Sequence, residues 1–259
     1  MDVSLLRTLE SAVARRQPVA TVTVLDGQFI GTKVLVTSNA QMLSGTSDDD
    51  GFDGRLGALG AQLLRERRTE ERTIATDAGE SRVFVESYLP PPSLVVIGAA
   101  HIAVPLTRFA QDLGFDVTLI DAREWFLTEE RFPHVARRIL AWPDKGLTQT
   151  TLDTETYLVI LSHDPKFERP ALKYALPYPL RYIGAIGSRK THADRIATLR
   201  AEGVSEDDLA RIHAPIGLDI GAVSPEEIAL SILAEMLAVR SGRPGGFMQA
   251  QRDAQGSAR

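Results

Sequence analysis

The stretch 93-SLVVIGAAHIAVPL-106 decides the fold, because it runs from an apolar strand through a short turn into an apolar-patterned helix. In dinucleotide-binding folds the first small residue of this turn permits a tight bend, the second lets backbone approach a pyrophosphate, and the third lets helix pack on strand. These positions hold Gly98, Ala100 and Ala103. Alanine suits the third position, but at the second its methyl group stands where a phosphate would approach. The turn therefore predicts a Rossmann-like βαβ unit and leaves its ligand open.

A carboxylate, Asp121, ends the second expected strand of this unit. A dinucleotide-binding protein places the acid that binds a ribose hydroxyl at this point, about 20 residues after the turn. The same residue can instead cap a loop in a βαβ unit that holds no nucleotide. Both interpretations remain open at this stage.

Three prolines at 90–92 separate two regions of the chain. Before them, the pattern predicts an opening helix, a helix at 56–68, and strands at 19–25, 33–37, 72–76 and 81–89. After them, it predicts apolar strands at 94–97, 116–120, 138–142, 157–161 and 182–186. Helical segments separate several of these later strands, which is typical of a parallel sheet covered on both faces.

We therefore predict an α/β fold with three parts. These are a smaller N-terminal α/β domain at 1–89, a Rossmann-like, doubly wound parallel sheet at 93–240, and a flexible tail at 241–259. The last helix is expected to begin at "SPEE", with Ser224 as its N-cap, Pro225 in its first turn and Glu227 completing a capping box.

Composition excludes several classes of function. The net charge of −5 argues against a nucleic-acid partner, because phosphate binding needs a basic face. No apolar run approaches the roughly 18–20 residues that a membrane span requires, and acids among the first leucines argue against a signal peptide, so we expect a cytoplasmic protein. The chain contains no cysteine, which excludes disulfides, thiolate metal ligands and a persulfide carried by the chain itself.

Polar residues follow several of the expected strands, in "LSHD" (161–164), "GSRK" (187–190) and "RIHAPIGLDIGA" (211–222). In an open parallel sheet, residues beyond the carboxyl ends of the strands converge on one crevice. A shared site is therefore expected to include His101, His163, His213, Ser188 and Arg189. By contrast, His134 and His192 are expected to be ordinary surface residues.

The helix after Gly187 offers unpaired N–H groups and a favourable dipole to an anion, and Arg189 and Lys190 add positive charge. The alternative is a solvated turn whose basic groups face water. We predict no metal site, because the histidines are widely separated and form no HxxxH-type pair. We also predict no catalytic residue: Ser162 and His163 are neighbours on a strand end and should diverge, and no nucleophile elbow, Walker loop or zinc-protease signature is present.

Five motifs taken together resemble the XdhC/CoxI family, over roughly residues 93–240. They are "GAAHIA" (98–103), "LIDAREWF" (119–126), "LSHD" (161–164), "YIGAIGSRKTHADRIATL" (182–199) and "RIHAPIGLDIGAVSPEEIALSILAE" (211–235). Members of this family are accessory proteins of xanthine dehydrogenase and related molybdenum hydroxylases. The family turn usually reads Gly-x-Gly-His, from which Ala100 departs. The "SSPR"-like and Gly-Gly-Cys elements of the N-terminal half are not visible here.

The resemblance implies a chaperone rather than an enzyme. Such a protein would bind molybdenum cofactor (molybdopterin, with or without an appended nucleotide) and support its sulfuration, with help from a cysteine desulfurase. It would then support insertion of the cofactor into an apo molybdenum hydroxylase of the xanthine dehydrogenase type. The expected cofactor-binding residues are Gly98, Ala100, His101, Asp121, His163, Asp164, Gly187, Ser188, Arg189, His213, Pro215 and Asp219.

Two other functions remain open. Gly98 and Asp121 also suit an NAD(P)-dependent oxidoreductase, for which only the histidines could supply an acid or base. The third possibility is a scaffold that has lost its ligand and only binds a partner protein. A homodimer is also expected as a possibility, because a two-domain carrier must shield a labile ligand.

Overall fold

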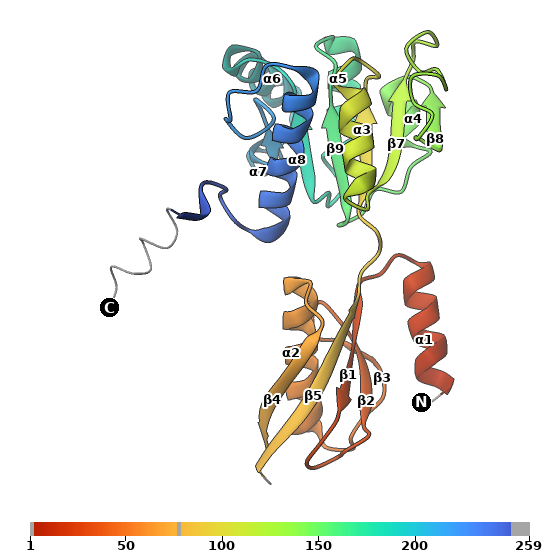
Figure 1. Cartoon of the computed structure of the whole chain (residues 1–259), viewed down its shortest axis with the longest axis vertical. Helices are drawn as coiled ribbons and strands as arrows, with labels where there is room; N and C mark the ends of the chain where they lie inside the picture. The colour runs from red at the N-terminus through yellow and green to blue at the C-terminus, as the bar shows by residue number, and fades with distance from the viewer. Residues whose placement is uncertain (1–2, 77–78, 250–259) are drawn as a thin grey trace. The chain divides into compact units, whose positions relative to one another are not determined.

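The computed structural model describes residues 3–76 and 79–249. The chain divides into two compact units, Met1–Pro90 and Pro91–Arg259, and the boundary falls in the proline run. Each unit has its own sheet (Figure 1).

The first unit is an antiparallel sheet in the order β3-β2-β1-β5-β4, with one helix on each face. Alternation along its strands produces two apolar faces: Val19 packs with α1, whereas Ala20 and Val22 pack with α2. Its elements are α1 (Val3–Ala14), β1 (Val19–Val24), β2 (Lys33–Thr37), β3 (Met42–Ser44), α2 (Asp50–Glu66), β4 (Glu70–Thr76) and β5 (Gly79–Tyr88).

The second unit is a six-stranded parallel sheet in the order β8-β7-β6-β9-β10-β11. Numbered within the unit, this is the strand order of a Rossmann fold. The predicted fold class is therefore confirmed. The elements are β6 (Ser93–Ile97), α3 (Ala103–Asp112), β7 (Asp116–Asp121), β8 (Arg137–Leu140), α4 (Pro143–Leu147), β9 (Thr156–Ile160), α5 (Pro165–Ala175), β10 (Tyr182–Ala185), α6 (Arg189–Ala201), α7 (Glu206–Ala210), β11 (Ile212–His213) and α8 (Pro225–Ser241).

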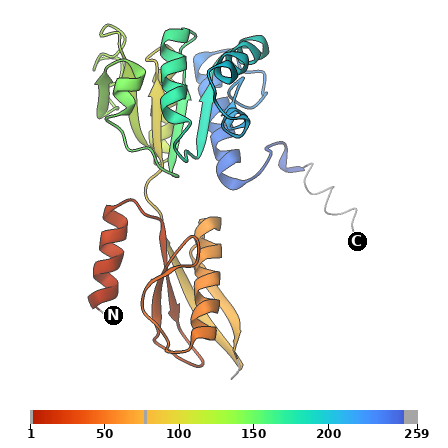
Figure 2. The same cartoon turned by 180° about the vertical axis from the view of Figure 1, so that it is seen from behind.

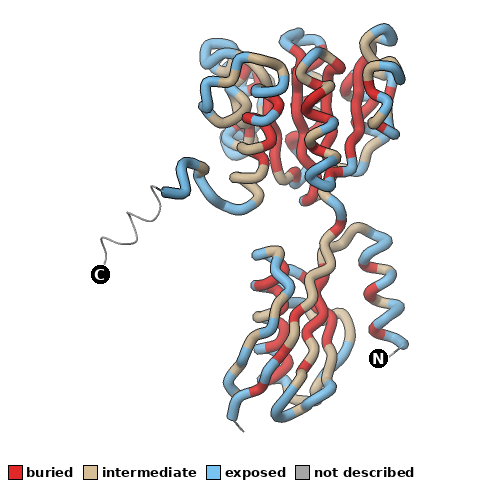
Figure 3. The backbone as a smooth tube through the Cα atoms, in the orientation of Figure 1, coloured by how far each residue is buried: buried red, intermediate tan, exposed pale blue. Residues whose placement is uncertain are grey.

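The parallel sheet is covered on both faces, as its near-continuous apolar strands require. Leu94 and Val96 of β6 face α3 and α8, and Val95 and Ile97 face α4, α5, α6 and α7. In Figure 1 α3 and α8 lie in front of the sheet, and Figure 2 shows the opposite face. The residues of its strands are mostly buried, and its exposed residues lie mainly in the loops and on the outer faces of the helices (Figure 3).

Helix α8 begins as its sequence predicts. Ser224 accepts a hydrogen bond from the Glu227 N–H, and Glu227 accepts one from the Ser224 N–H, which completes the capping box. Gly242 ends the helix with a φ of 65°. Of the expected tail, residues 250–259 lie outside the described residues. Within the described ranges, no helix is long and apolar enough to cross a membrane.

Candidate functional site

The carboxyl ends of β6 and β9 form the switch point of the parallel sheet. These strands are neighbours, with Ile97 paired to Ile160, and the chain leaves them toward α3 on one face and α5 on the other. Ligands of open parallel sheets bind at such a point. Gly98 brings the two loops together: its φ is +101°, and a Cβ there would lie 3.4 Å from the Ser162 backbone nitrogen. The structure thus places Gly98, Ala100 and the residues after Leu161 along one rim.

Asp121 is fully buried and held within its own loop. Its carboxylate accepts hydrogen bonds from the Ala99 N–H (2.7 Å), the Arg123 N–H (2.9 Å) and the Arg123 Nε and Nη2 groups (2.9 and 2.8 Å). Burial opposes ionisation of Asp121, but these donors outweigh it and lower its pKa. Of the two interpretations of Asp121, the geometry favours the loop cap, because its oxygens already have partners.

The Arg123 guanidinium lies 4.3 Å from the centroid of the Phe126 ring and 5.2 Å from that of Phe167. Hydrogen bonding to Asp121 raises the pKa of Arg123, burial opposes the rise, and the charges of Asp121 and Asp164 add to it. Asp164 is exposed and caps α5, where it accepts a hydrogen bond from the Lys166 N–H at 2.9 Å. The Asp121–Arg123 ion pair therefore occupies the place at the end of β7 where a ribose would bind.

The start of α6 is an exposed, N-capped helix terminus, which is compatible with both the anion-binding and the solvated-turn interpretation. Ser188 caps the helix by accepting from the Thr191 N–H at 3.1 Å, and Ser188, Arg189 and Lys190 are all exposed. Gly187 has a φ of +142°, and a Cβ there would lie 3.2 Å from Thr191. Glycine therefore permits the tight entry into the helix.

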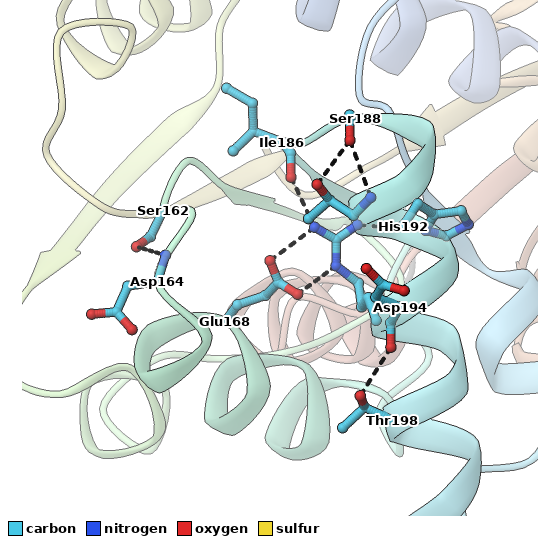
Figure 4. Close-up of polar contacts among 10 residues, drawn as sticks. Ser162, Asp164, Glu168, Ile186, Ser188, His192, Asp194 and Thr198 are labelled. Atoms are coloured by element: carbon cyan, nitrogen blue, oxygen red, sulfur yellow. Dashed lines mark hydrogen bonds and ion pairs between the residues drawn. The ribbon is translucent and has the colours of Figure 1, made fainter.

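A buried ion pair between Arg195 and Glu168 lies beside the turn that precedes α6 (Figure 4). Arg195 binds Glu168 of α5 through two hydrogen bonds, one of them 2.8 Å long, and also donates to the Ile186 carbonyl at 2.8 Å. The two side chains are only 1% and 9% exposed. The pair therefore links α5, α6 and the backbone just before Gly187.

His213 lies on the other face of the sheet, against α8. Its ring stacks on Tyr182 at 4.7 Å between centroids, and its Nδ1 lies 3.2 Å from Glu235 Oε1. Glu235 also accepts hydrogen bonds from the Tyr182 hydroxyl and, at 2.8 Å, from the Gly217 N–H. Burial opposes ionisation of Glu235, but the hydrogen bonds from His213, Tyr182 and Gly217 outweigh it and lower its pKa.

His101 is exposed and lines a hollow of about 450 Å³. The hollow lies between α3, the loop after β7 and the first turn of α8; its other lining residues are Val104, Pro105, Trp125, Phe126, Arg131, Pro225 and Glu226. His163 is exposed at the start of α5, whereas Pro215 and Asp219 are exposed in the loop before α8. The predicted residues are thus divided between the two sides of the sheet rather than placed around one pocket.

Two of the predictions for histidines are wrong. His134 and His192 are half-buried rather than ordinary surface residues. His134 Nε2 lies 2.8 Å from the Thr107 hydroxyl, and His192 Nδ1 lies 3.4 Å from Arg195. Burial lowers the pKa of His192, and the charge of Arg195 lowers it further. Among residues 3–76 and 79–249, no group of three or more His, Cys, Asp or Glu side chains could hold a metal ion.

Sequence reasoning did not select the residues that organise these sites, namely Arg123, Arg131, Glu168, Tyr182, Arg195 and Glu235. All six lie inside or close to the motifs that carry the family resemblance, but charge and spacing alone do not indicate a partner that is distant in the sequence. Glu168 and Arg195, for example, are 27 residues apart and meet only when α5 and α6 pack on the same face.

The model of the XdhC Rossmann domain family matches residues 94–236. The chain belongs to the XdhC family. The matched range runs from β6 into α8 and so includes the switch point, the α6 turn and the His213–Glu235 contact. It also includes each residue that we named as a candidate for cofactor binding.

Three curated relatives extend the comparison. The chain is 33% identical over 198 residues to YqeB of Escherichia coli, an uncharacterized protein, and this match covers 76% of the chain and 35% of YqeB. It is 31% identical over 160 residues to a protein of Bacillus subtilis named as a probable subunit of xanthine dehydrogenase, covering 62% and 46%. It is 38% identical over 89 residues to the molybdenum cofactor insertion chaperone PaoD of Escherichia coli, covering 34% and 28%. The XdhC-family chain thus matches less than half the length of each relative.

A crystal structure described as a xanthine dehydrogenase from Bacillus halodurans has a similar fold, with a TM-score of 0.55. The two are 16% identical, and the match covers 95% of this chain and 98% of that one. At this identity the likeness concerns the fold alone. The relatives' names do not support the NAD(P) alternative, and neither does the occupied carboxylate of Asp121.

Proposed function

We propose that this XdhC-family protein binds molybdenum cofactor and supports its sulfuration and its insertion into xanthine dehydrogenase or a related molybdenum hydroxylase. The observation that carries the proposal is the XdhC match over residues 94–236, which includes both the switch point and the exposed Ser188–Arg189 turn. The name of PaoD, with which the chain shares 38% identity over 89 residues, supports the same role.

The residues present suit the cofactor in their chemistry. Molybdopterin ends in a phosphate, and the first turn of α6 offers backbone N–H groups, the Arg189 guanidinium and the Lys190 ammonium, all at an exposed helix start. Gly98, Ala100 and His101 follow β6, which β9 separates from β10 and the α6 turn, so they lie farther along the same carboxyl edge of the sheet. When bound, the cofactor would supply the molybdenum and dithiolene chemistry that the recipient hydroxylase uses.

The sulfur for this maturation must come from outside the chain. With no cysteine, the chain cannot form a persulfide of its own. We therefore propose a cysteine desulfurase as the sulfur donor, and a role for this protein as the holder of the cofactor while it receives sulfur. Self-association into a homodimer, which would help to shield the cofactor, stays a prediction that sedimentation can test.

The deciding experiment is an equilibrium titration of the purified protein with molybdenum cofactor, NADH and NADPH, followed by transfer to an apo-hydroxylase. We expect retention of the molybdenum cofactor, recovery of hydroxylase activity after transfer, and no comparable binding of either nicotinamide. Tight binding of NADH or NADPH with turnover of a carbonyl substrate would favour the oxidoreductase instead. Failure to retain any of the three would leave only the scaffold function.

Arg189→Ala should weaken cofactor retention by about 1.5–3 kcal/mol, the usual range for a hydrogen bond to a charged group. The phosphate would lose its guanidinium donor, whereas Ser188 would still cap the helix. The measurement is the dissociation constant from titration at fixed ionic strength. Arg200→Ala is the matched control, because Arg200 is an exposed arginine at the other end of α6. Equal affinities for the Arg189 variant and the wild type would remove this residue from the site.

A further inference from the structure

The hollow beside His101 has the position and size of a ligand site. It lies beyond the carboxyl ends of β6 and β7, where parallel sheets bind their ligands. Its volume of about 450 Å³ falls within the range of small-molecule pockets. It is separate from the α6 turn, because α3 and α8 cover the face of the sheet opposite α6.

The wall of this hollow is fixed by hydrogen bonds rather than formed by a loose loop. Arg131 Nη1 donates to the Ala99 carbonyl at 2.9 Å and to the Phe126 carbonyl at 2.5 Å. These bonds tie the loop after β7 to the turn after β6. The backbone that carries Trp125 and Phe126 is thereby held at the edge of the hollow, and the centroids of their two rings are 6.2 Å apart. A rigid wall reduces the entropy lost on binding.

The lining combines flat apolar surface with a few polar groups. Trp125 is 71% exposed, although a large aromatic ring normally gains from burial, and Val104, Pro105 and Pro225 line the same hollow. Among the described residues, the side chains of His101 and Glu226 have no hydrogen-bonding or ionic partner in the protein. This combination suits a planar heterocycle that stacks on an indole and presents N–H groups to a carboxylate.

We propose that this hollow binds the fused heteroaromatic ring of the ligand, with Trp125 stacking on the ring and Glu226 accepting hydrogen bonds from its amino-amide edge. This edge, an amino group beside a ring N–H, is shared by a pterin and by guanine. The inference rests on the proposed function, because it assigns the ring of the cofactor to the α3–α8 side of the sheet. A carboxylate acceptor would discriminate against cytosine, which lacks the ring N–H.

The two tryptophans of the chain make the test direct. Trp142 is also exposed, at 51%, but it packs on Phe167 and does not line the hollow, so it is the matched control. In a Trp142→Phe protein, Trp125 is the only tryptophan, and its fluorescence reports stacking. We expect 6-hydroxymethylpterin, GMP or both to quench it and CMP to quench it much less. The responding probe distinguishes a pterin ring from the base of an appended nucleotide.

Calorimetric titration with the same probes supplies the affinities. Trp125→Ala should weaken binding of the responding probe about 10- to 100-fold, as expected for loss of ring stacking, and Glu226→Gln should weaken it while sparing the weak binding of CMP. Trp142→Ala should leave the affinity unchanged. The proposal is overturned if no probe quenches Trp125, if CMP binds as tightly as the others, or if the Trp142 variant loses as much affinity. These readouts use free ring compounds, so they remain decisive even if the complete protein fails to transfer a cofactor.

Discussion

Glu168→Ala will lower the free energy of unfolding of the Rossmann unit by about 3–5 kcal/mol, the cost of leaving a buried charge without its partner. The Arg195 side chain is 1% exposed, and among the described residues its guanidinium would keep only the Ile186 carbonyl and the His192 ring, 3.4 Å away, as polar partners. Urea denaturation followed by circular dichroism measures the effect. Because the pair ties α5 to α6, we also expect faster amide exchange in the turn at Gly187.

The exposed pair formed by Arg200 and Glu206 is the control for this prediction. Glu206→Ala should change the unfolding free energy very little, since solvent screens such pairs. A second variant separates charge from packing: Glu168→Leu combined with Arg195→Met replaces both charges and should recover most of the loss. A single Glu168→Ala variant as stable as the wild type would show that the pair does not hold this turn.

Glu235→Ala should lower the unfolding free energy by about 1–3 kcal/mol, because it leaves the buried Tyr182 hydroxyl and two partly buried donors without their acceptor. The Tyr182 hydroxyl, the Gly217 N–H and the His213 ring all contact this carboxylate, whose side chain is 16% exposed. Burial and the charge of Glu235 raise the pKa of Tyr182, so the phenol stays a donor. Glu235→Gln should lose less, because the amide oxygen still accepts one or two of these bonds.

The pH dependence of the same variants gives a second test. Glu235 has a lowered pKa in the folded protein, so its ionisation stabilises the fold at pH values above the pKa of an unfolded glutamate, about 4.3. The extra stability disappears as the pH falls through the lowered folded value. We therefore expect the wild type to exceed Glu235→Gln in unfolding free energy at pH 7, and the gap to close in acid. A gap that is constant from pH 7 to pH 3 would contradict a charged Glu235.

The local pattern of apolar, turn-forming and capping residues was enough to predict the main strands and the fold class of this protein. The long apolar strands and the Ser224 capping box follow from nearest-neighbour chemistry, and the structure agrees with both. Two short strands, β3 and β11, were not predicted. A three-residue and a two-residue strand have too little periodicity to detect, and they exist because a longer neighbour pairs with them.

The candidate site was less predictable from the sequence. Its chemistry depends on which side chains form hydrogen bonds and ion pairs with each other in the folded protein. The pattern indicated that these loops follow the carboxyl ends of parallel strands, but it did not indicate on which face of the sheet each side chain would lie. His213 ends β11 and Arg189 follows the neighbouring strand β10, yet the first packs against α8 and the second begins a helix on the opposite face. The role of Asp121 depended on Arg123, two residues away, whose conformation the sequence pattern does not encode.

The carboxylate at the end of β7 is turned inward by a single neighbouring cation. In this protein Arg123 donates to both oxygens of the Asp121 carboxylate, which a ribose hydroxyl would otherwise contact. Asp121 therefore stabilises its own loop instead of binding a ligand. A redesign for nicotinamide dinucleotide binding would therefore have to replace Arg123 first. Only then would the Asp121 carboxylate be free to accept a hydrogen bond from the ribose.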